Sequence, residues 1–136
     1  MAILDSGCSS VYLQINSPCV NKKTTKNPIS VSLPNGTILK STHEAELKLT
    51  MLPKTARRAH ILPNLNNGAL ISISQLCNSG CRVIFDAPIA TIMLNGRIIL
   101  IGNRNYETGL YEVNIDEQEK PKEKRKIQFD KQEKTK

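Results

Sequence analysis

Short apolar segments with a period of two, separated by tight turns, are the feature of this sequence that most restricts its fold. Residues 29–33 alternate apolar and polar side chains, and the pair Asn35-Gly36 follows them. An Asn-Gly pair after such a segment is typical of a two-stranded hairpin, so we expect residues 38–40 to form the second strand. The pair Asn95-Gly96 predicts another hairpin. Similar segments predict further strands at residues 2–4, 10–13, 45–49, 59–62, 82–85, 89–94, 97–101 and 110–113.

One short helix is predicted after the apolar pair Leu70-Ile71. Ser72 or Ser74 can cap its start, and Gly80 can end it. Three residues between these points have helical spacing, namely Ile73, Leu76 and Cys77. Residues 14–28 are polar and rich in turn-forming residues, which predicts a surface loop. Many short strands with one short helix predict an all-β domain, built as a small barrel or sandwich.

The C-terminal segment differs in composition from the rest of the chain. The whole chain has 136 residues, which is the size of one domain. Residues 116–136 contain 8 basic and 6 acidic residues, and their large apolar side chains are Ile127 and Phe129 alone. Such a segment buries too little surface to offset the entropy lost on ordering. We therefore predict a folded domain at residues 1–115, followed by a charged disordered tail or linker.

Charge and hydropathy exclude several classes of protein. The formal net charge is +7, but the basic residues form no stripe interleaved with aromatic side chains, so we do not expect direct nucleic-acid binding. No apolar run approaches the roughly 18 residues that cross a bilayer, so we expect no membrane partner. Residues 1–4 reach Asp5 before a hydrophobic region develops, which predicts no signal peptide and a cytoplasmic location.

The cysteines and histidines are not expected to bind a metal. A reducing compartment disfavours disulfides, so the cysteines are expected to be free thiols. The spacing of the histidines and of the two later cysteines fits no compact zinc motif. We expect neither a metal nor another cofactor. The residues considered are Cys8, Cys19, Cys77, Cys81, His43 and His60.

The triplet Asp5-Ser6-Gly7 carries the clearest indication of chemistry. It places a carboxylate at the end of an apolar strand, followed by a hydroxyl and by a glycine that lets other groups approach closely. The Ser6 hydroxyl can hydrogen-bond across the turn and hold it rigid. The alternative is an ordinary turn between a strand and a loop, in which Asp5 accepts local backbone hydrogen bonds.

Other segments place this triplet in a wider pattern. The triplet lies within Ile3-Leu4-Asp5-Ser6-Gly7-Cys8-Ser9-Ser10, and Leu33-Pro34-Asn35-Gly36-Thr37 follows later. Ala59-His60-Ile61-Leu62-Pro63-Asn64-Leu65 then leads into Ala69-Leu70-Ile71-Ser72-Ile73-Ser74-Gln75-Leu76-Cys77. Together these segments resemble the retropepsin-type aspartic proteases, specifically the protease region of copia-type retrotransposon polyproteins. Gly109-Leu110-Tyr111 resembles the family's boundary with the segment before the integrase. The resemblance runs from residue 2 to about residue 115.

The resemblance implies a small retropepsin-like closed barrel, completed as a homodimer. Each chain would supply one Asp5, and the two carboxyl groups would meet at the two-fold axis and share a proton. The pair would activate a water molecule for peptide-bond hydrolysis, without a metal or a covalent intermediate. Ser6 would brace the two active-site turns, and Gly7 would admit backbone contacts. The implied substrate is an extended peptide of the chain's own polyprotein, cut in the cytoplasm or in virus-like particles.

The hairpin around Gly36 resembles the family's flap. A two-stranded ribbon with a glycine tip can open to admit substrate and close to exclude water. The peptide would lie beneath it, paired as a β-strand. An ordinary surface hairpin is the alternative. Residues 69–72 resemble the family's second strand-to-helix element, with a structural role. The flap residues are expected to be Leu33, Pro34, Asn35, Gly36, Thr37 and Ile38.

Two other functions stay open on the sequence alone. Four residues precede Asp5, fewer than the N-terminal strand that retropepsins use in their dimer. A degenerate or domesticated module of this fold, which binds peptides or assembles without catalysis, is therefore an alternative. The net charge of +7 and the lysine-rich C-terminal segment leave a nucleic-acid-associated domain as a third interpretation.

Overall fold

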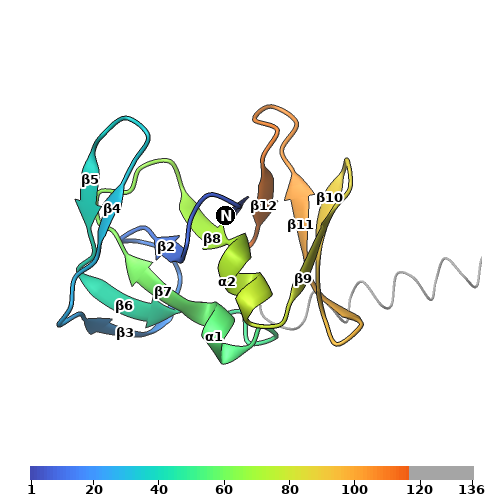
Figure 1. Cartoon of the computed structure of the whole chain (residues 1–136), viewed down its shortest axis with the longest axis horizontal. Coiled ribbons are helices and arrows are strands. Elements are labelled where there is room, and N and C mark those ends of the chain that lie inside the picture. Colours follow the sequence, from blue (N-terminus) through green and yellow to red (C-terminus); the bar gives the residue numbers. More distant parts are fainter. Residues whose placement is uncertain (117–136) are drawn as a thin grey trace, which may run out of the picture.

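The computed structural model describes residues 1–116 (Figure 1). Short strands contain far more of these residues than the two helices do, which confirms the mainly β class. The predicted tail lies outside the described residues, apart from Asp116. The strands are β1 (Ala2–Asp5), β2 (Val11–Leu13), β3 (Val20–Thr24), β4 (Ser30–Ser32), β5 (Ile38–Lys40), β6 (His43–Glu46), β7 (Arg58–Ile61), β8 (Ala69–Ser72), β9 (Arg82–Phe85), β10 (Ile89–Leu94), β11 (Arg97–Arg104) and β12 (Tyr111–Val113). The helices are α1 (Lys54–Arg57) and α2 (Ile73–Asn78).

Ten of the strands form one open sheet. Their order is β3-β6-β7-β2-β8-β1-β12-β11-β10-β9, and β4 and β5 form a separate two-stranded sheet. The family resemblance implied a closed barrel, which is wrong for this chain, because β3 and β9 are the two unpaired edges of the sheet within residues 1–116. All five residues of β3 are exposed, and two of them are lysines, which disfavour pairing with a further strand.

Two pairs of parallel strands determine where the loops of the domain meet. β1 runs parallel to β8, with Asp5 opposite Ser72, and β2 runs parallel to β7, with Val11 opposite Ala59. β2 and β8 are antiparallel at Tyr12 and Leu70, which joins the two pairs. The other edge of β1 pairs with β12. The C-terminal ends of β1 and β8 therefore lie side by side, and α2 begins next to the end of β1.

The side chains beneath the sheet form the main hydrophobic core. It is built mainly from small and branched residues of β1, β2, β6, β7, β8, β10, β11 and β12, together with the loop after β6 and the buried faces of α1 and α2. A second, smaller cluster lies between the sheet and the β4–β5 hairpin and contains Tyr12, Leu39, Leu62 and Leu65. Residues in the main core that are fully shielded from solvent include Leu13, Leu47, Leu49, Ile61, Ile71, Leu76 and Ile92.

Both predicted Asn-Gly turns are present. Asn95 and Gly96 have φ angles of +53° and +78°, the left-handed conformation that a tight hairpin turn requires. Gly36 has a φ of +89° in the turn that joins β4 to β5. The hairpins were predictable because their signal is local.

The predicted helix is α2. The Ser72 hydroxyl caps it by accepting a hydrogen bond of 3.0 Å from the Gln75 backbone N–H, and Gly80 follows its end with a φ of +93°. The single predicted helix is nevertheless an undercount, because α1 forms one turn after Pro53. The two described helices have four and six residues, and neither approaches the length and hydrophobicity needed to cross a bilayer.

The surface loop predicted at residues 14–28 is wrong in part, because it contains β3. This strand pairs with β6 through its backbone and buries none of its side chains. A strand with no buried face has no alternation in its sequence, so hydrophobic periodicity gives no sign of it.

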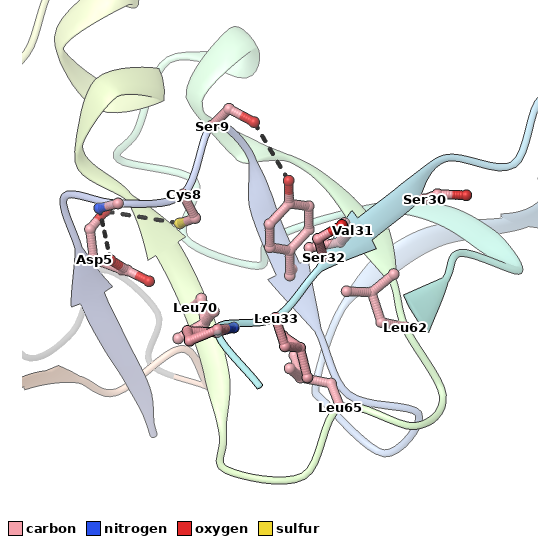
Figure 2. Close-up of a pocket in the computed structure, with 13 residues that line it drawn as sticks. Asp5, Cys8, Ser9, Ser30, Val31, Ser32, Leu33, Leu62, Leu65 and Leu70 are labelled. Atoms are coloured by element: carbon pink, nitrogen blue, oxygen red, sulfur yellow. Dashed lines mark hydrogen bonds between the residues drawn. The ribbon is translucent and has the colours of Figure 1, made fainter. Parts of the chain in front are cut away.

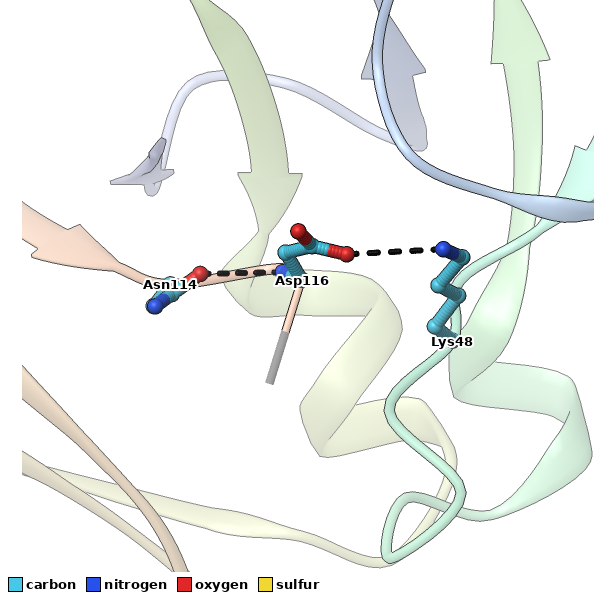
Figure 3. A network of polar contacts seen from close by, with 3 residues as sticks. All are labelled: Lys48, Asn114 and Asp116. Atoms are coloured by element: carbon cyan, nitrogen blue, oxygen red, sulfur yellow. Dashed lines mark hydrogen bonds and ion pairs between the residues drawn. The ribbon is translucent and has the colours of Figure 1, made fainter. Parts of the chain in front are cut away.

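An ion pair lies at the end of the described chain. Lys48 Nζ lies 3.4 Å from Asp116 Oδ1, and the Asp116 backbone N–H donates a 3.0 Å hydrogen bond to Asn114 Oδ1 (Figure 3). Both charged side chains are substantially exposed, so this pair adds little stability. The burial of Ile115 beside it holds the end of the chain more firmly.

We predict that Leu13→Ala lowers the free energy of unfolding by about 2–5 kcal/mol, because it opens a cavity in the main core. Leu110→Ala removes the same atoms from a side chain that is 44% exposed, and the expected loss is about 0.5 kcal/mol. Urea denaturation followed by circular dichroism measures both. Equal losses in the two variants would contradict the assignment of Leu13 to the core.

Candidate active site

A cavity of about 610 Å³ lies between the Asp5 turn, the sheet and the β4–β5 hairpin (Figure 2). Its walls come from segments that are distant in the sequence and meet because of the parallel pairings. The turn supplies polar groups, and the sheet and the hairpin supply mostly apolar ones. The lining residues are Asp5, Gly7, Cys8, Ser9, Tyr12, Ser30, Val31, Ser32, Leu33, Pro34, Leu62, Leu65 and Leu70.

Asp5 lies at the last position of β1, where the chain leaves the sheet. One of its carboxylate oxygens, Oδ1, accepts a 2.7 Å hydrogen bond from the Gly7 backbone N–H. A Cβ atom at position 7 would lie 3.2 Å from that oxygen, so glycine allows this close approach. Within residues 1–116 no cation forms an ion pair with Asp5. The carboxylate is thus held by its own turn and still reaches the cavity.

The other two residues of the triplet are placed differently. Gly7 lines the cavity beside Asp5, whereas Ser6 is exposed and does not line it. The triplet forms the turn that the sequence predicted. A bracing contact by Ser6 would require a second copy of the chain.

Cys8 is the next residue of the turn and has an unusually weak acid group. Its thiol Sγ lies 3.7 Å from the Asp5 backbone oxygen, to which it donates. Burial, and after it the nearby charge of Asp5, together raise the pKa of Cys8 to about 11. The thiol is therefore protonated at neutral pH and is a donor rather than a nucleophile.

The first turn of α2 contacts the loop that follows Asp5. The Ser72 hydroxyl, which is fully buried, donates a 2.8 Å hydrogen bond to the Cys8 backbone oxygen. Gln75 Oε1 accepts a 2.9 Å hydrogen bond from the Val11 backbone N–H. The sequence interpretation treated Ser72 as structural and overlooked Gln75. The Ser-x-x-Gln spacing is typical of a capping box and marks the start of α2, but it gives no signal for the contact between Gln75 and Val11.

The β4–β5 hairpin covers the cavity with fewer of the expected flap residues than the sequence indicated. Leu33 and Pro34 line it, while Asn35, Gly36, Thr37 and Ile38 do not. The sequence interpretation left out residues 30–32, which also line it (Figure 2). The lining residues therefore come from β4 and the two residues after it, on one arm of the hairpin.

The opposite wall of the cavity is apolar. Leu62 and Leu65 lie in the loop after β7, and Leu70 lies in β8 (Figure 2). Tyr12 of β2 packs in the same cluster and also lines the cavity. The Tyr12 hydroxyl is 3.4 Å from Ser9 Oγ, which links this wall to the Asp5 turn. A carboxylate beside an apolar wall and beneath a hairpin suits an extended chain with apolar side chains.

Two smaller hollows flank His60 on the outer surface of the sheet. They measure about 200 and 360 Å³, and both are lined by Arg58 and His60. Burial lowers the pKa of His60, while the neighbouring Glu44 acts in the opposite direction. The smaller hollow mixes acidic and basic side chains, whereas the larger is lined by hydroxyl and amide side chains together with Arg58 and His60. Within residues 1–116, His60 Nδ1 has no hydrogen-bond partner.

The residues considered for metal binding are not gathered into a site. All four cysteines are free thiols: Cys81 is buried, Cys8 and Cys19 are partly buried, and Cys77 is exposed. Residues 1–116 hold no cluster of three or more histidine, cysteine, aspartate or glutamate side chains suited to a metal ion. The candidate site is therefore the cavity beside Asp5.

Comparison of the chain with protein-family models, with curated proteins and with solved structures finds no match in any of the three.

We predict that Cys8 is alkylated by iodoacetamide much more slowly than the exposed Cys77. At pH 8 a thiol with a pKa of about 11 is roughly 0.1% thiolate, the reactive form. The Cys8 rate should rise about tenfold per pH unit until the pH approaches that pKa. Peptide mass spectrometry over time measures both sites, and urea-unfolded protein is the control, in which the two rates converge. Faster labelling of Cys8 in the folded protein would contradict the pKa.

Proposed function

We propose that the protein is an aspartic endopeptidase of the retropepsin type, active as a homodimer in which each chain supplies Asp5. The observation that carries the proposal is the Asp5 carboxylate in the wall of a cavity covered by a hairpin. The local resemblance in residues 3–10, 33–37, 59–65 and 69–77 supports the same reaction. On that basis the substrate is the precursor polyprotein of a copia-type retrotransposon, cut in the cytoplasm or in virus-like particles.

The chemistry requires two carboxyl groups that share one proton. Two aspartates close together cannot both be ionised, so the pair titrates as a unit with one proton between them. The ionised group takes a proton from a water molecule as the water oxygen attacks the peptide carbonyl carbon. The protonated group gives its proton to the carbonyl oxygen. Proton transfer to the amide nitrogen then allows the C–N bond to break.

The surroundings of Asp5 suit this role. Its oxygen Oδ1 already accepts the Gly7 N–H, which orients the carboxylate. With no cation paired to it within residues 1–116, the carboxylate remains available to bind water and to exchange protons. The apolar wall of Leu62, Leu65 and Leu70 would exclude bulk water from the reacting peptide.

The hairpin provides a way to bind and release an extended peptide. The β4–β5 pair has no strand ladder with the main sheet, so it can move as a ribbon. The peptide would lie between the hairpin and the apolar wall, making β-type backbone hydrogen bonds. Closure would order the peptide beside the carboxyl pair.

A non-catalytic peptide-binding module is the second candidate function. The observation that favours it is that one chain alone contains the cavity, its apolar wall and the hairpin. Peptide binding would need no second copy, whereas catalysis would.

We predict that Asp5→Asn reduces cleavage of a precursor-derived peptide by about 10²–10⁴-fold, because the variant loses a group that accepts and donates protons. The parent protein should show a bell-shaped pH dependence with a mildly acidic optimum and should be blocked by statine inhibitors. Asp86→Asn is the matched control, because Asp86 is exposed and outside the cavity. If Asp5→Asn cleaves as fast as Asp86→Asn, Asp5 is not catalytic.

We predict that an excess of Asp5→Asn protein inhibits the parent. Each mixed dimer would have one carboxyl group and one amide at the shared site, and so would lack the pair that catalysis needs. The same excess of Asp86→Asn protein should not inhibit it. Peptide cleavage is measured at constant parent concentration, alongside sedimentation equilibrium of the parent. A strict monomer that still binds the peptide would reject the dimeric enzyme and support the binding module.

A further inference from the structure

The loop between β1 and β2 is held at two points by the first turn of α2. Ser72 Oγ donates to the Cys8 backbone oxygen at 2.8 Å, and Gln75 Oε1 accepts from the Val11 backbone N–H at 2.9 Å. These contacts join residues that are 64 positions apart in the sequence. The loop that begins with Asp5 therefore has a support outside itself.

Gln75 uses both donors and one acceptor site of its side-chain amide on backbone groups. In addition to the bond to Val11, its Nε2 donates to the Thr55 oxygen at 3.0 Å and to the Arg58 oxygen at 2.8 Å. A reversed amide would set its donors against the Val11 N–H and its acceptor against two carbonyls. The three partners thus determine the orientation of the amide.

The three partners of Gln75 lie where separate elements converge. Thr55 is in α1, Arg58 begins β7, and Val11 begins β2, which runs parallel to β7 from this point. One side chain thus connects the Asp5 loop to the helix and the strand beside it. Leucine or alanine at this position would leave a backbone N–H and two carbonyls without this partner.

We propose that Gln75 is a positioning residue for Asp5, acting together with Ser72. This inference rests on the proposed protease function. In the dimer, the separation of the two carboxyl groups depends on two copies of the Asp5 loop. Holding the loop at Cys8 and Val11 fixes the distance over which the proton is shared.

The effect of Gln75 on catalysis should be separable from an effect on substrate binding. Gln75 does not line the cavity, and the apolar wall is formed by other residues. Loosening the loop should therefore lower kcat and leave KM nearly unchanged. It should also let the two carboxyl groups separate, so that their apparent pKa values approach one another. The bell-shaped pH profile would then become narrower from both sides.

Gln75→Ala tests this, with Asn78→Ala as the matched control on the same helix. Asn78 is exposed and makes none of the contacts to the loop. We expect kcat of Gln75→Ala to fall by about tenfold to a hundredfold, with KM within about twofold of the parent value. The pH profile should narrow in Gln75→Ala and keep its width in Asn78→Ala. An unchanged kcat and an unchanged profile would overturn the inference.

Gln75→Glu keeps the inference testable if Gln75→Ala fails to fold. The glutamate retains an acceptor for the Val11 N–H, but its ionised form donates nothing to the Thr55 and Arg58 oxygens. Below its pKa the protonated carboxyl group regains one donor. We expect kcat relative to the parent to recover as the pH falls, in protein that thermal melting shows to be folded. A ratio that does not change with pH would overturn the inference.

The activity of the parent protein distinguishes a failure of the positioning role of Gln75 from a failure of the proposed function. A parent that cleaves the peptide, with Gln75 variants indistinguishable from it, rejects the positioning role and leaves the proposed function intact. A parent that cleaves no peptide and does not dimerise rejects the proposed function, and this inference falls with it.

Discussion

β1 and β8 lie side by side in the centre of the sheet and run in the same direction, with Asp5 opposite Ser72. Their inward side chains, Ala2 and Leu4 on one strand and Ala69 and Ile71 on the other, are buried in the main core. Burial of this apolar surface offsets the entropy of bringing two distant segments together. Because the two strands are parallel, their C-terminal ends lie side by side. The Asp5 carboxylate and the helix α2, which supports its loop, meet at these strand ends for that reason.

The support behind the Asp5 turn is buried, while the turn itself faces the cavity. The Ser72 hydroxyl is fully buried and satisfied, since it donates to Cys8 and accepts from Gln75. A buried hydroxyl that lost these partners would be costly, which makes the arrangement well determined. Ser6 and Gly7 are exposed by contrast. A turn held from behind and open in front suits a group that must keep its place while it meets a substrate.

Local patterns in the sequence predicted the hairpins, α2, and the turn at Asp5. Each depends on residues within a few positions of one another, such as Asn95 and Gly96 or Ser72 and Gly80. The open edge of the sheet and β3 were not predictable in this way, because they depend on long-range pairing and, in β3, on backbone contacts alone. The cavity wall at Leu62, Leu65 and Leu70 and the reach of Gln75 to Val11 were missed because no sequence period encodes them.

The hairpin combines a fixed base with a loosely held arm. At the base, Ser41 donates its backbone N–H to the Ile29 oxygen and accepts from the Ile29 N–H through its hydroxyl. Beyond the base, the arm is packed on the sheet by Leu39, with Val31 and Leu33 partly buried beside it. Full burial of one leucine is worth about 1.5–3 kcal/mol, whereas unfolding a whole domain costs about 5–15 kcal/mol. In the proposed enzyme, lifting the arm would break the small cluster and leave the base, the sheet and the Asp5 turn in place, which is what opening of the cavity to a substrate requires.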